Sequence, residues 1–281
     1  MRKTSDTSRI SFIIPRSASL FDVFSDPMPS SASRRGEIFL HRGDLTQARF
    51  WYEQAVSEAR DLESLQALSE ALGNLGNVCA LLEAHTPAED CYREVLEIQR
   101  TLQDDNAIGE TLVNLGNLKT DTGQPELARA FYLEAVDALT PLGNDRALGI
   151  LYSNLALQEF RLHNTEAAIK AFQAALDFHR KVGNEDGLAA TYGQLGKTFF
   201  LDGNFRKAEA CLNNATEHFI KLGNGPGEAG ALRLLADVYE KRRDHLSAIR
   251  CLERAVLIDQ TYRLPHYEED VQRSNRLRQM S

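Results

Sequence analysis

The sequence repeats itself every forty residues, and this period limits the possible folds more than any other feature does. Asn74-Leu75-Gly76-Asn77 recurs forty residues later as Asn114-Leu115-Gly116-Asn117. Steps of forty also connect two columns of small residues, which are Ala48, Ala88, Ala128, Ala168, Ala208 and Ala248, and Gly36, Gly76, Gly116, Ala156, Gly196 and Ala236. Repeats of this length stack on their neighbours instead of surrounding one core, so we expect a repeat array.

Each repeat is predicted to hold two helices. Apolar residues recur at i, i+3, i+4 and i+7, as over residues 167–178, and this is the period of an amphipathic helix. Alternation typical of strands is absent, so the predicted fold class is all-α. Gly followed by Asn is a natural helix stop, because both tolerate the left-handed backbone conformation. Helix ends are expected near Gly123, His163 and Gly203, and near Gly143-Asn144, Gly183-Asn184 and Gly223-Asn224.

A column of bulky residues accompanies the small ones. Its members are Tyr52, Tyr92, Tyr132, Phe172, Leu212 and Leu252. A small residue in the first helix that faces an alanine in the second lets the two backbones approach closely. The bulky side chain is then expected to fill the space beside them.

These columns resemble the tetratricopeptide repeat, whose pattern is W-x2-L-G-x2-Y followed by A-x3-F. The L-G pair is matched by Leu75-Gly76, Leu115-Gly116, Leu155-Ala156, Leu195-Gly196 and Leu235-Ala236, and the A-x3-F pair by Ala88 with Tyr92, Ala128 with Tyr132 and Ala168 with Phe172. The resemblance implies a right-handed α-α superhelical solenoid of about six helix pairs over residues 29–262. Its repeats would start near residues 29, 69, 109, 149, 189 and 229, and the first is degenerate because Arg35 replaces the leucine.

The chain departs from the family pattern in two ways. Its period is forty residues, and the terminal proline of the motif is missing, so we expect the second helix of each repeat to run further. In this respect the chain is similar to the repeats of Pins-type polarity adaptors and, more loosely, to the repeat domains of bacterial peptide sensors. Lys119 and Glu159 stand where the motif has an aromatic residue, which predicts looser packing or a partner surface.

The two ends differ from the array. Residues 1–28 form a serine-rich leader that Pro15 and Pro27 interrupt, so a flexible or partly ordered segment is predicted. Its apolar clusters leave two alternatives open: a cap on the first repeat, which we favour, or an internal ligand in the groove. Residues 263–281 are predicted to form a C-terminal capping helix, because Leu264-Pro265 ends the last repeat and a polar helix follows.

Composition excludes several classes of protein. The net charge of −8 disfavours binding to nucleic acid. No apolar stretch is long enough for a signal peptide or a membrane span, and the four cysteines suit a reducing compartment, so we expect a cytoplasmic protein. Cys91, Cys211 and Cys251 share one repeat column, which favours a core position for them.

No enzyme is predicted. Gly196-Lys197-Thr198 resembles the end of a phosphate loop, but Thr191 occupies the position of the required first glycine, and the segment falls inside a repeat helix. The seven histidines are never spaced as zinc ligands are and are expected at the surface. We therefore expect no catalytic residue, no metal and no small-molecule cofactor.

The resemblance implies that the first helices of successive repeats line a concave groove. Carboxamides recur on that face, and an amide side chain both donates and accepts hydrogen bonds, as a peptide backbone does. Alternatively, these asparagines bond to neighbouring helices or turns. The predicted partner-binding residues are Asn74, Asn77, Asn114, Asn117, Asn154, Arg161, Gln194, Lys197 and Arg233.

Charge on the same face changes sign along the chain. Acidic residues come early, and basic ones come late, which favours a ligand whose acidic segment lies toward the late repeats. These residues are Glu70, Glu110 and Asp121, then Arg161, Lys197, Arg233 and Lys241.

Some tetratricopeptide domains grip a C-terminal carboxylate with lysine, arginine and asparagine side chains. The equivalent positions here are Gly73, Asn77, Asn114, Ile150 and Asn154, so the cations are missing and a clamp of that type is disfavoured. The function predicted from the sequence is a non-enzymatic scaffold or adaptor that binds a peptide or helix of a partner protein. A regulatory sensor that binds a small diffusible peptide and modulates a bound effector is the alternative.

Overall fold

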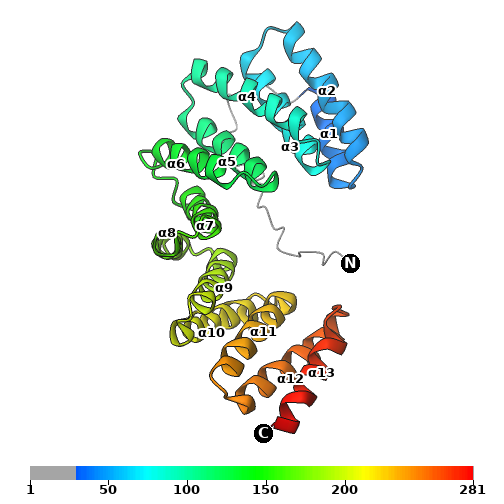
Figure 1. Ribbon diagram of the computed structural model, residues 1–281. Coiled ribbons are helices and arrows are strands. Elements are labelled where there is room, and N and C mark those ends of the chain that lie inside the picture. Colours follow the sequence, from blue (N-terminus) through cyan, green and yellow to red (C-terminus); the bar gives the residue numbers. More distant parts are fainter. Residues whose placement is uncertain (1–29, 281) are drawn as a thin grey trace. The chain divides into compact units, whose positions relative to one another are not determined.

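The computed structural model describes residues 30–280, and within this range the chain forms thirteen helices and no strand (Figure 1). The predicted all-α class and the six helix pairs are confirmed. In chain order the helices are α1 (Ser31–His41), α2 (Leu45–Asp61), α3 (Leu65–Leu81), α4 (His85–Leu102), α5 (Asp105–Asp121), α6 (Pro125–Leu139), α7 (Asp145–Arg161), α8 (Thr165–Lys181), α9 (Glu185–Leu201), α10 (Phe205–Lys221), α11 (Gly225–Lys241), α12 (His245–Tyr262) and α13 (Tyr267–Met280).

The forty-residue period consists of two equal halves. From α2 to α12 each helix begins twenty residues after the one before it. One residue with positive φ closes each turn at the same spacing, and these residues are Gly43, Glu63, Glu83, Gln103, Gly123, Gly143, His163, Gly183, Gly203, Gly223, Arg243 and Arg263. The six helix ends predicted from the sequence coincide with six of these turns, and six of the twelve turns use a residue other than glycine.

Two details go beyond the sequence prediction. Five of the six A-helices begin about four residues before the predicted repeat start, as α3 does at Leu65 rather than near Ser69, whereas α1 begins at Ser31. Both helices of a repeat therefore share the added length. The asparagine of each Gly-Asn pair does not take the left-handed conformation. It is the N-cap of the following helix, as when the Asn184 Oδ1 accepts from the Gly187 N–H at 3.0 Å.

The helices group into two compact units, which divide after Gly143. Unit 1 holds α1–α6 and unit 2 holds α7–α13. Within each unit every helix packs on the next. Odd-numbered helices also touch one another: α3 contacts α5 in unit 1, and α9 contacts both α7 and α11 in unit 2. We call α1, α3, α5, α7, α9 and α11 the A-helices and α2, α4, α6, α8, α10 and α12 the B-helices.

The small and bulky columns form the core, as predicted. All six alanines of the first column are fully buried, and so are the bulky residues beside them. A Cβ added at Gly76 would lie 2.7 Å from the Tyr92 ring, and one at Gly116 would lie 2.3 Å from Tyr132. Glycine is needed at these positions because any side chain there would displace the ring.

Lys119 and Glu159 do not form the predicted partner surface or a loose contact. Both are buried, with 7% and 5% of their surface exposed. The Lys119 ammonium lies 2.6 Å from the Glu89 carboxylate of α4, and Glu159 accepts a hydrogen bond from Asn164 at 2.8 Å. Charges replace the aromatic residue here because each has a polar partner within the fold.

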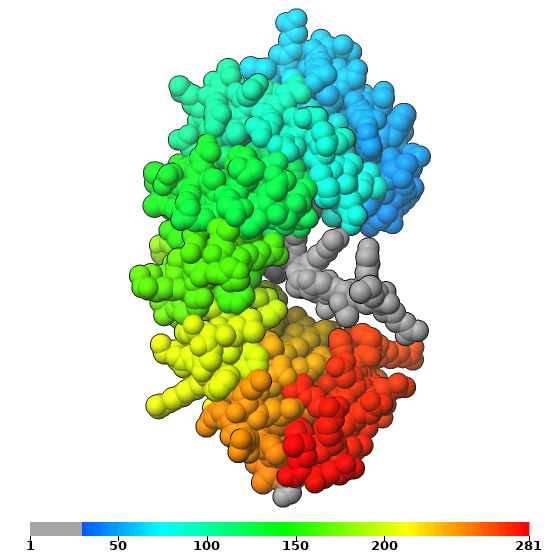
Figure 2. Space-filling model, viewed as in Figure 1, coloured from blue at the N-terminus to red at the C-terminus, as the bar shows by residue number. Residues whose placement is uncertain are grey.

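Helix α13 packs on α12, the second helix of the sixth repeat. Leu277 lies in one cluster with Ala236, Ile249 and Leu252, and Figure 2 shows the red C-terminal residues beside the orange ones of the preceding helices. The predicted leader, residues 1–28, lies outside the described residues. No helix within residues 30–280 is long and apolar enough to cross a membrane.

Candidate binding face

All nine residues predicted to bind a partner lie on A-helices. Eight of them form two groups, one in each unit, which we call the A-helix faces. The face of unit 1 carries Asn74, Asn77, Asn114 and Asn117 on α3 and α5, and the face of unit 2 carries Asn154, Arg161, Gln194 and Lys197 on α7 and α9. Asn74, Arg161, Gln194 and Lys197 are exposed, and Asn77, Asn114 and Asn154 are half-buried. Asn117 is only 7% exposed.

The structure brings carboxamides of successive repeats together in unit 1. The Asn114 Nδ2 lies 3.5 Å from the Asn77 Oδ1, although the two residues are 37 positions apart. The Tyr92 hydroxyl donates to the same oxygen at 2.8 Å. Asn77 thus belongs both to the face and to the interior of its own repeat.

Asn117 repeats this arrangement one period later. It accepts from the Tyr132 hydroxyl at 2.7 Å, and Thr120 Oγ1 lies 3.2 Å from that hydroxyl. Burial raises the pKa of Tyr92, so the phenol stays protonated and keeps its proton for the asparagine. Asn77 and Asn117 therefore each make a hydrogen bond within the fold, as the alternative interpretation of these asparagines predicted.

Three glycines inside A-helices have no packing reason to be glycine. A Cβ added at Gly73, Gly193 or Gly230 would meet nothing within 4 Å. Glycine inside a helix costs about 1 kcal/mol relative to alanine. The repeat pattern assigned these three glycines no role. Gly73 and Gly193 lie three residues before the small-residue column, at a position where glycine is not needed for helix pairing.

Arg233, on the A-helix α11, forms ion pairs within the fold. Its guanidinium pairs with Asp259 of α12 at 2.5 Å and with Asp270 of α13 at 2.7 Å, and both aspartates are almost fully buried. Breaking this network would leave buried carboxylates without a counter-charge. Arg233 therefore ties α11 to α12 and α13, and we leave it out of the binding residues that we propose. Arg273 of α13 ties the same helix to α11 through Asp237 and Glu240.

One histidine expected at the surface is in the core of unit 2. His179 is 2% exposed and lies where side chains on Gly149 and Gly187 would otherwise point. Its Nδ1 lies 3.2 Å from Asn184 Nδ2 and its Nε2 lies 3.4 Å from Ser153 Oγ. Burial lowers the pKa of His179, so the ring is neutral at pH 7. The pair of glycines that makes room for it was the signal in the sequence.

The segment that resembles a phosphate loop and the cysteines of the repeat column both lie within repeat helices. Gly196-Lys197-Thr198 is in the middle of α9, where Thr198 Oγ1 donates to the Gln194 carbonyl at 2.9 Å. Cys91 is buried and Cys211 and Cys251 are half-buried, and burial raises the pKa of Cys91 to about 12. Residues 30–280 hold no group of three or more His, Cys, Asp or Glu side chains arranged for a metal.

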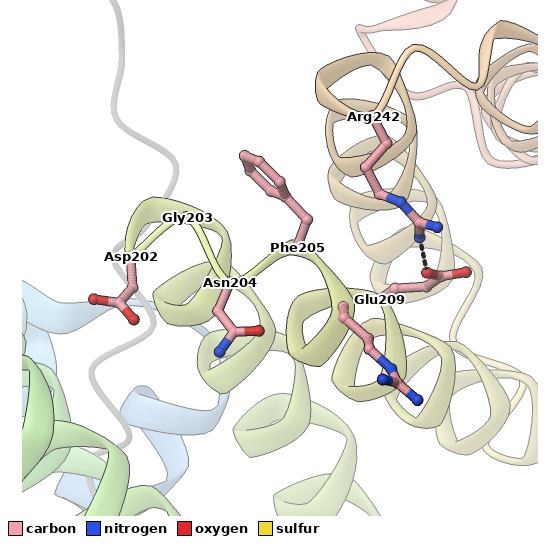
Figure 3. A pocket seen from close by; sticks show the side chains of 7 residues that line it. Asp202, Gly203, Asn204, Phe205, Glu209 and Arg242 are labelled. Atoms are coloured by element: carbon pink, nitrogen blue, oxygen red, sulfur yellow. Dashed lines mark hydrogen bonds and ion pairs between the residues drawn. The ribbon is translucent and has the colours of Figure 1, made fainter.

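An open pocket of about 720 Å³ lies at the turns of repeats five and six, and none of the candidate binding residues lines it. Figure 3 shows Arg242, at the end of α11, and Glu209 of α10 directed toward one another, and the two form an ion pair. Asp202, Asn204 and Phe205 line the rest. Because its charged side chains of opposite sign neutralise one another, the pocket has no clear preference for an anion or a cation.

The comparisons with known proteins agree with this architecture. A family model described as tetratricopeptide repeat matches residues 28–101, 68–141, 107–181, 147–221 and 188–261. The chain belongs to the tetratricopeptide repeat family. These matches cover nearly the whole region in which the sequence predicted repeats. No curated protein matches the sequence.

Solved structures of tetratricopeptide proteins share the fold. BtubC from P. vanneervenii superposes with a TM-score of 0.71 at 22% identity, over 78% of this chain and 92% of BtubC. RapI in its apo form gives 0.69 at 14% identity, over 88% of this chain and 96% of RapI. A STAND signal-transduction ATPase from Pyrococcus horikoshii, which has a tetratricopeptide repeat sensor, gives 0.69 at 15% identity, over 87% of this chain and 41% of the ATPase.

Proposed function

We propose that this protein is a non-enzymatic scaffold that holds an extended segment of a partner protein along its A-helix faces. The contact between Asn77 and Asn114 supports the proposal most, because it places carboxamides of two successive repeats side by side on one surface. A carboxamide matches the N–H and C=O of a peptide backbone without reading its side chains. Gly73, on the same surface, keeps space open for a chain to approach.

The dimensions of the array suit such a ligand. Packed helices lie about 8–10 Å apart, and an extended chain advances about 3.3 Å per residue. One carboxamide per repeat then meets about every third residue of the ligand. Asn74, Asn77 and Asn114 of unit 1, and Asn154, Gln194 and Lys197 of unit 2, are the residues we propose for this role.

Charge suggests which part of the ligand meets which unit. Glu70, Glu110 and Asp121 belong to unit 1, whereas Lys197 and Lys241 of unit 2 are cationic and exposed. Arg233 is paired to Asp259 and Asp270, so the exposed cations that carry this proposal on unit 2 are Lys197 and Lys241. We propose that an acidic stretch of the partner lies along unit 2. We also propose that the protein acts in the cytoplasm and that it binds no nucleic acid, membrane or cofactor.

A sensor is the second candidate. The Pyrococcus ATPase carries its tetratricopeptide repeats as a sensor, which makes ligand-controlled regulation a use of this fold in another protein. A sensor should change its hydrodynamic radius when a short peptide binds, whereas an adaptor should keep it. Small-angle scattering of the chain with and without a bound peptide separates the two.

The test is a selection of short peptides from a phage-displayed library on the full-length chain. Peptides that bind wild type should lose about tenfold or more in affinity for Asn74→Ala/Asn114→Ala, because each lost hydrogen bond contributes about 1 kcal/mol. The control is Asn213→Ala/Asn214→Ala, which removes two exposed carboxamides from the B-helix α10. If no peptide is selected, or if both variants bind as wild type does, the proposal is wrong.

A further inference from the structure

Two buried tyrosines each hold one asparagine of the unit 1 face. Tyr92 and Tyr132 are 2% and 1% exposed, and their rings pack on Gly76 and Gly116. Each hydroxyl reaches past the glycine to the next residue of the A-helix, where it donates to the oxygen of Asn77 or Asn117. The B-helix of a repeat therefore fixes a carboxamide on its own A-helix.

In the three repeats that have a tyrosine in the bulky column, the sequence also provides an acceptor for its hydroxyl. Where the bulky column has tyrosine, the residue after the small one carries a side-chain oxygen, and where it has Phe172 the equivalent residue is Leu157. Where the column has leucine, the equivalent residue is charged, either a lysine or an aspartate. The six combinations are Tyr52 with Glu37, Tyr92 with Asn77, Tyr132 with Asn117, Phe172 with Leu157, Leu212 with Lys197 and Leu252 with Asp237. A tyrosine hydroxyl thus occurs only with a residue that can accept a hydrogen bond from it.

The hydroxyl also decides which end of the carboxamide is presented. The Asn77 oxygen takes one hydrogen bond from Tyr92 and lies 3.5 Å from Asn114 Nδ2, so both of its lone-pair directions are engaged. The NH₂ group of Asn77 lies at the opposite end of the same planar amide. A side chain that could otherwise rotate to donate or to accept is therefore set as a donor.

We propose that Tyr92 is a positioning residue, which sets Asn77 so that unit 1 recognises hydrogen-bond acceptors, namely the main-chain carbonyls of an extended polypeptide. Tyr132 holds the buried Asn117 in the same way inside the fold. This inference rests on the proposed function and assigns the chemistry of its ligand. Repeats four to six have no such couple, so their faces select by charge and apolar contact instead. A segment bound on unit 1 should then be held through its backbone, and a segment bound on unit 2 through its side chains.

The first experiment needs no ligand. In the full-length chain labelled with ¹⁵N-asparagine, the side-chain NH₂ resonances of Asn77 are assigned by their loss in Asn77→Asp. Tyr92→Phe keeps the ring on Gly76 and removes the hydroxyl. We expect the Asn77 resonances to move toward random-coil positions and to gain mobility in Tyr92→Phe, and to stay unchanged in Tyr52→Phe. If Tyr92→Phe leaves them unchanged, the positioning role is wrong whether or not a peptide binds.

The second experiment uses a peptide selected on the wild-type chain as the probe. Tyr92→Phe should weaken its binding about fivefold, the effect of one hydrogen bond, and Tyr52→Phe should not. The peptide is then altered one residue at a time, by an ester that weakens the carbonyl acceptor or by an N-methyl group that removes only the N–H. Recognition of carbonyls predicts that an ester weakens binding at a position where N-methylation does not.

The outcomes separate this inference from the function on which it rests. If the peptide binds the A-helix face but Tyr92→Phe binds it as tightly as wild type, the scaffold stands and the tyrosine has only a packing role. Sensitivity to N-methylation alone would show that the face reads N–H groups, and this would overturn the assignment of carbonyls. Failure to select any peptide would count against the scaffold itself.

Discussion

Glycine has two opposite roles on the same helix. Gly196 of α9 belongs to the small-residue column, and a Cβ there would lie 2.6 Å from Leu212. Gly193, one turn earlier, faces open space. The period predicted the first role, because Gly196 recurs as a small residue in every repeat. It could not predict the second, because the equivalent residues Val113, Ser153 and Arg233 differ and their surroundings depend on the fold.

These two glycines should respond to alanine in opposite directions. Gly193→Ala should stabilise the chain by about 1 kcal/mol, the helix preference of alanine, because nothing opposes the added methyl group. Gly196→Ala should destabilise it by about 1–3 kcal/mol through crowding against Leu212. Thermal melts of the two variants beside wild type measure the difference. Destabilisation by Gly193→Ala would mean that the α9 surface is already occupied within the chain.

The buried His179 makes stability depend on pH. Burial lowers its pKa below the unfolded value of about 6.5, so between these two values the unfolded chain binds the extra proton. Stability from this residue is complete above pH 6.5 and is lost as the pH falls toward the folded pKa. Melting of wild type between pH 7 and 5 should therefore drop more steeply than that of His179→Gln, which stays neutral. Parallel curves for the two proteins would contradict this.

At the scale of the helix and its turn, the sequence predicted six of the helix ends but not how the helices are capped. The twenty-residue spacing held even where the turn has Glu63, Glu83 or Arg243 in place of glycine, because the period of the neighbouring turns locates it. Whether an asparagine after glycine ends one helix or begins the next depends on one backbone angle. Single-residue preferences do not determine that angle, since asparagine suits both positions.

The turns also offer a matched pair of substitutions. Glu83 has φ of 57°, which costs a residue with a side chain about 1–2 kcal/mol, so Glu83→Gly should raise the melting temperature. Gly123 has φ of 70° at the same step of the pattern, and Gly123→Ala should lower it. Differential scanning calorimetry compares the two with wild type. A lower melting temperature for Glu83→Gly would show that its side chain contributes more than its backbone costs.

For the whole molecule, the repeat predicted the family, the helix count and the column of core residues, but not the division into two compact units after Gly143. The column continues through the division, since Ala128 and Ala168 are both fully buried. The period alone placed the candidate binding residues on the A-helices. It did not reveal the ion pairs of Arg233, because Asp259 and Asp270 lie in segments that the repeat pattern does not pair with it.

Repeat arrays gain stability mainly from neighbouring helices, so damage should stay local. Arg233→Met leaves Asp259 and Asp270 buried without their cation and should destabilise unit 2 by about 3 kcal/mol. Hydrogen exchange should then speed up at α11–α13 and stay unchanged at α1–α5. Equal acceleration in both units would show that the chain unfolds as one cooperative body.

The central claim is that a partner lies on the A-helix faces, and site-specific photocrosslinking in cells tests it most directly. A photoreactive phenylalanine replaces Asn74, Gln194 or Asn213 in turn, all three being exposed, the first two on A-helices and the third on the B-helix α10. We predict that positions 74 and 194 crosslink the same protein and that position 213 does not. A crosslink at 213 without one at 74 or 194 would place the partner on the B-helices and contradict the account.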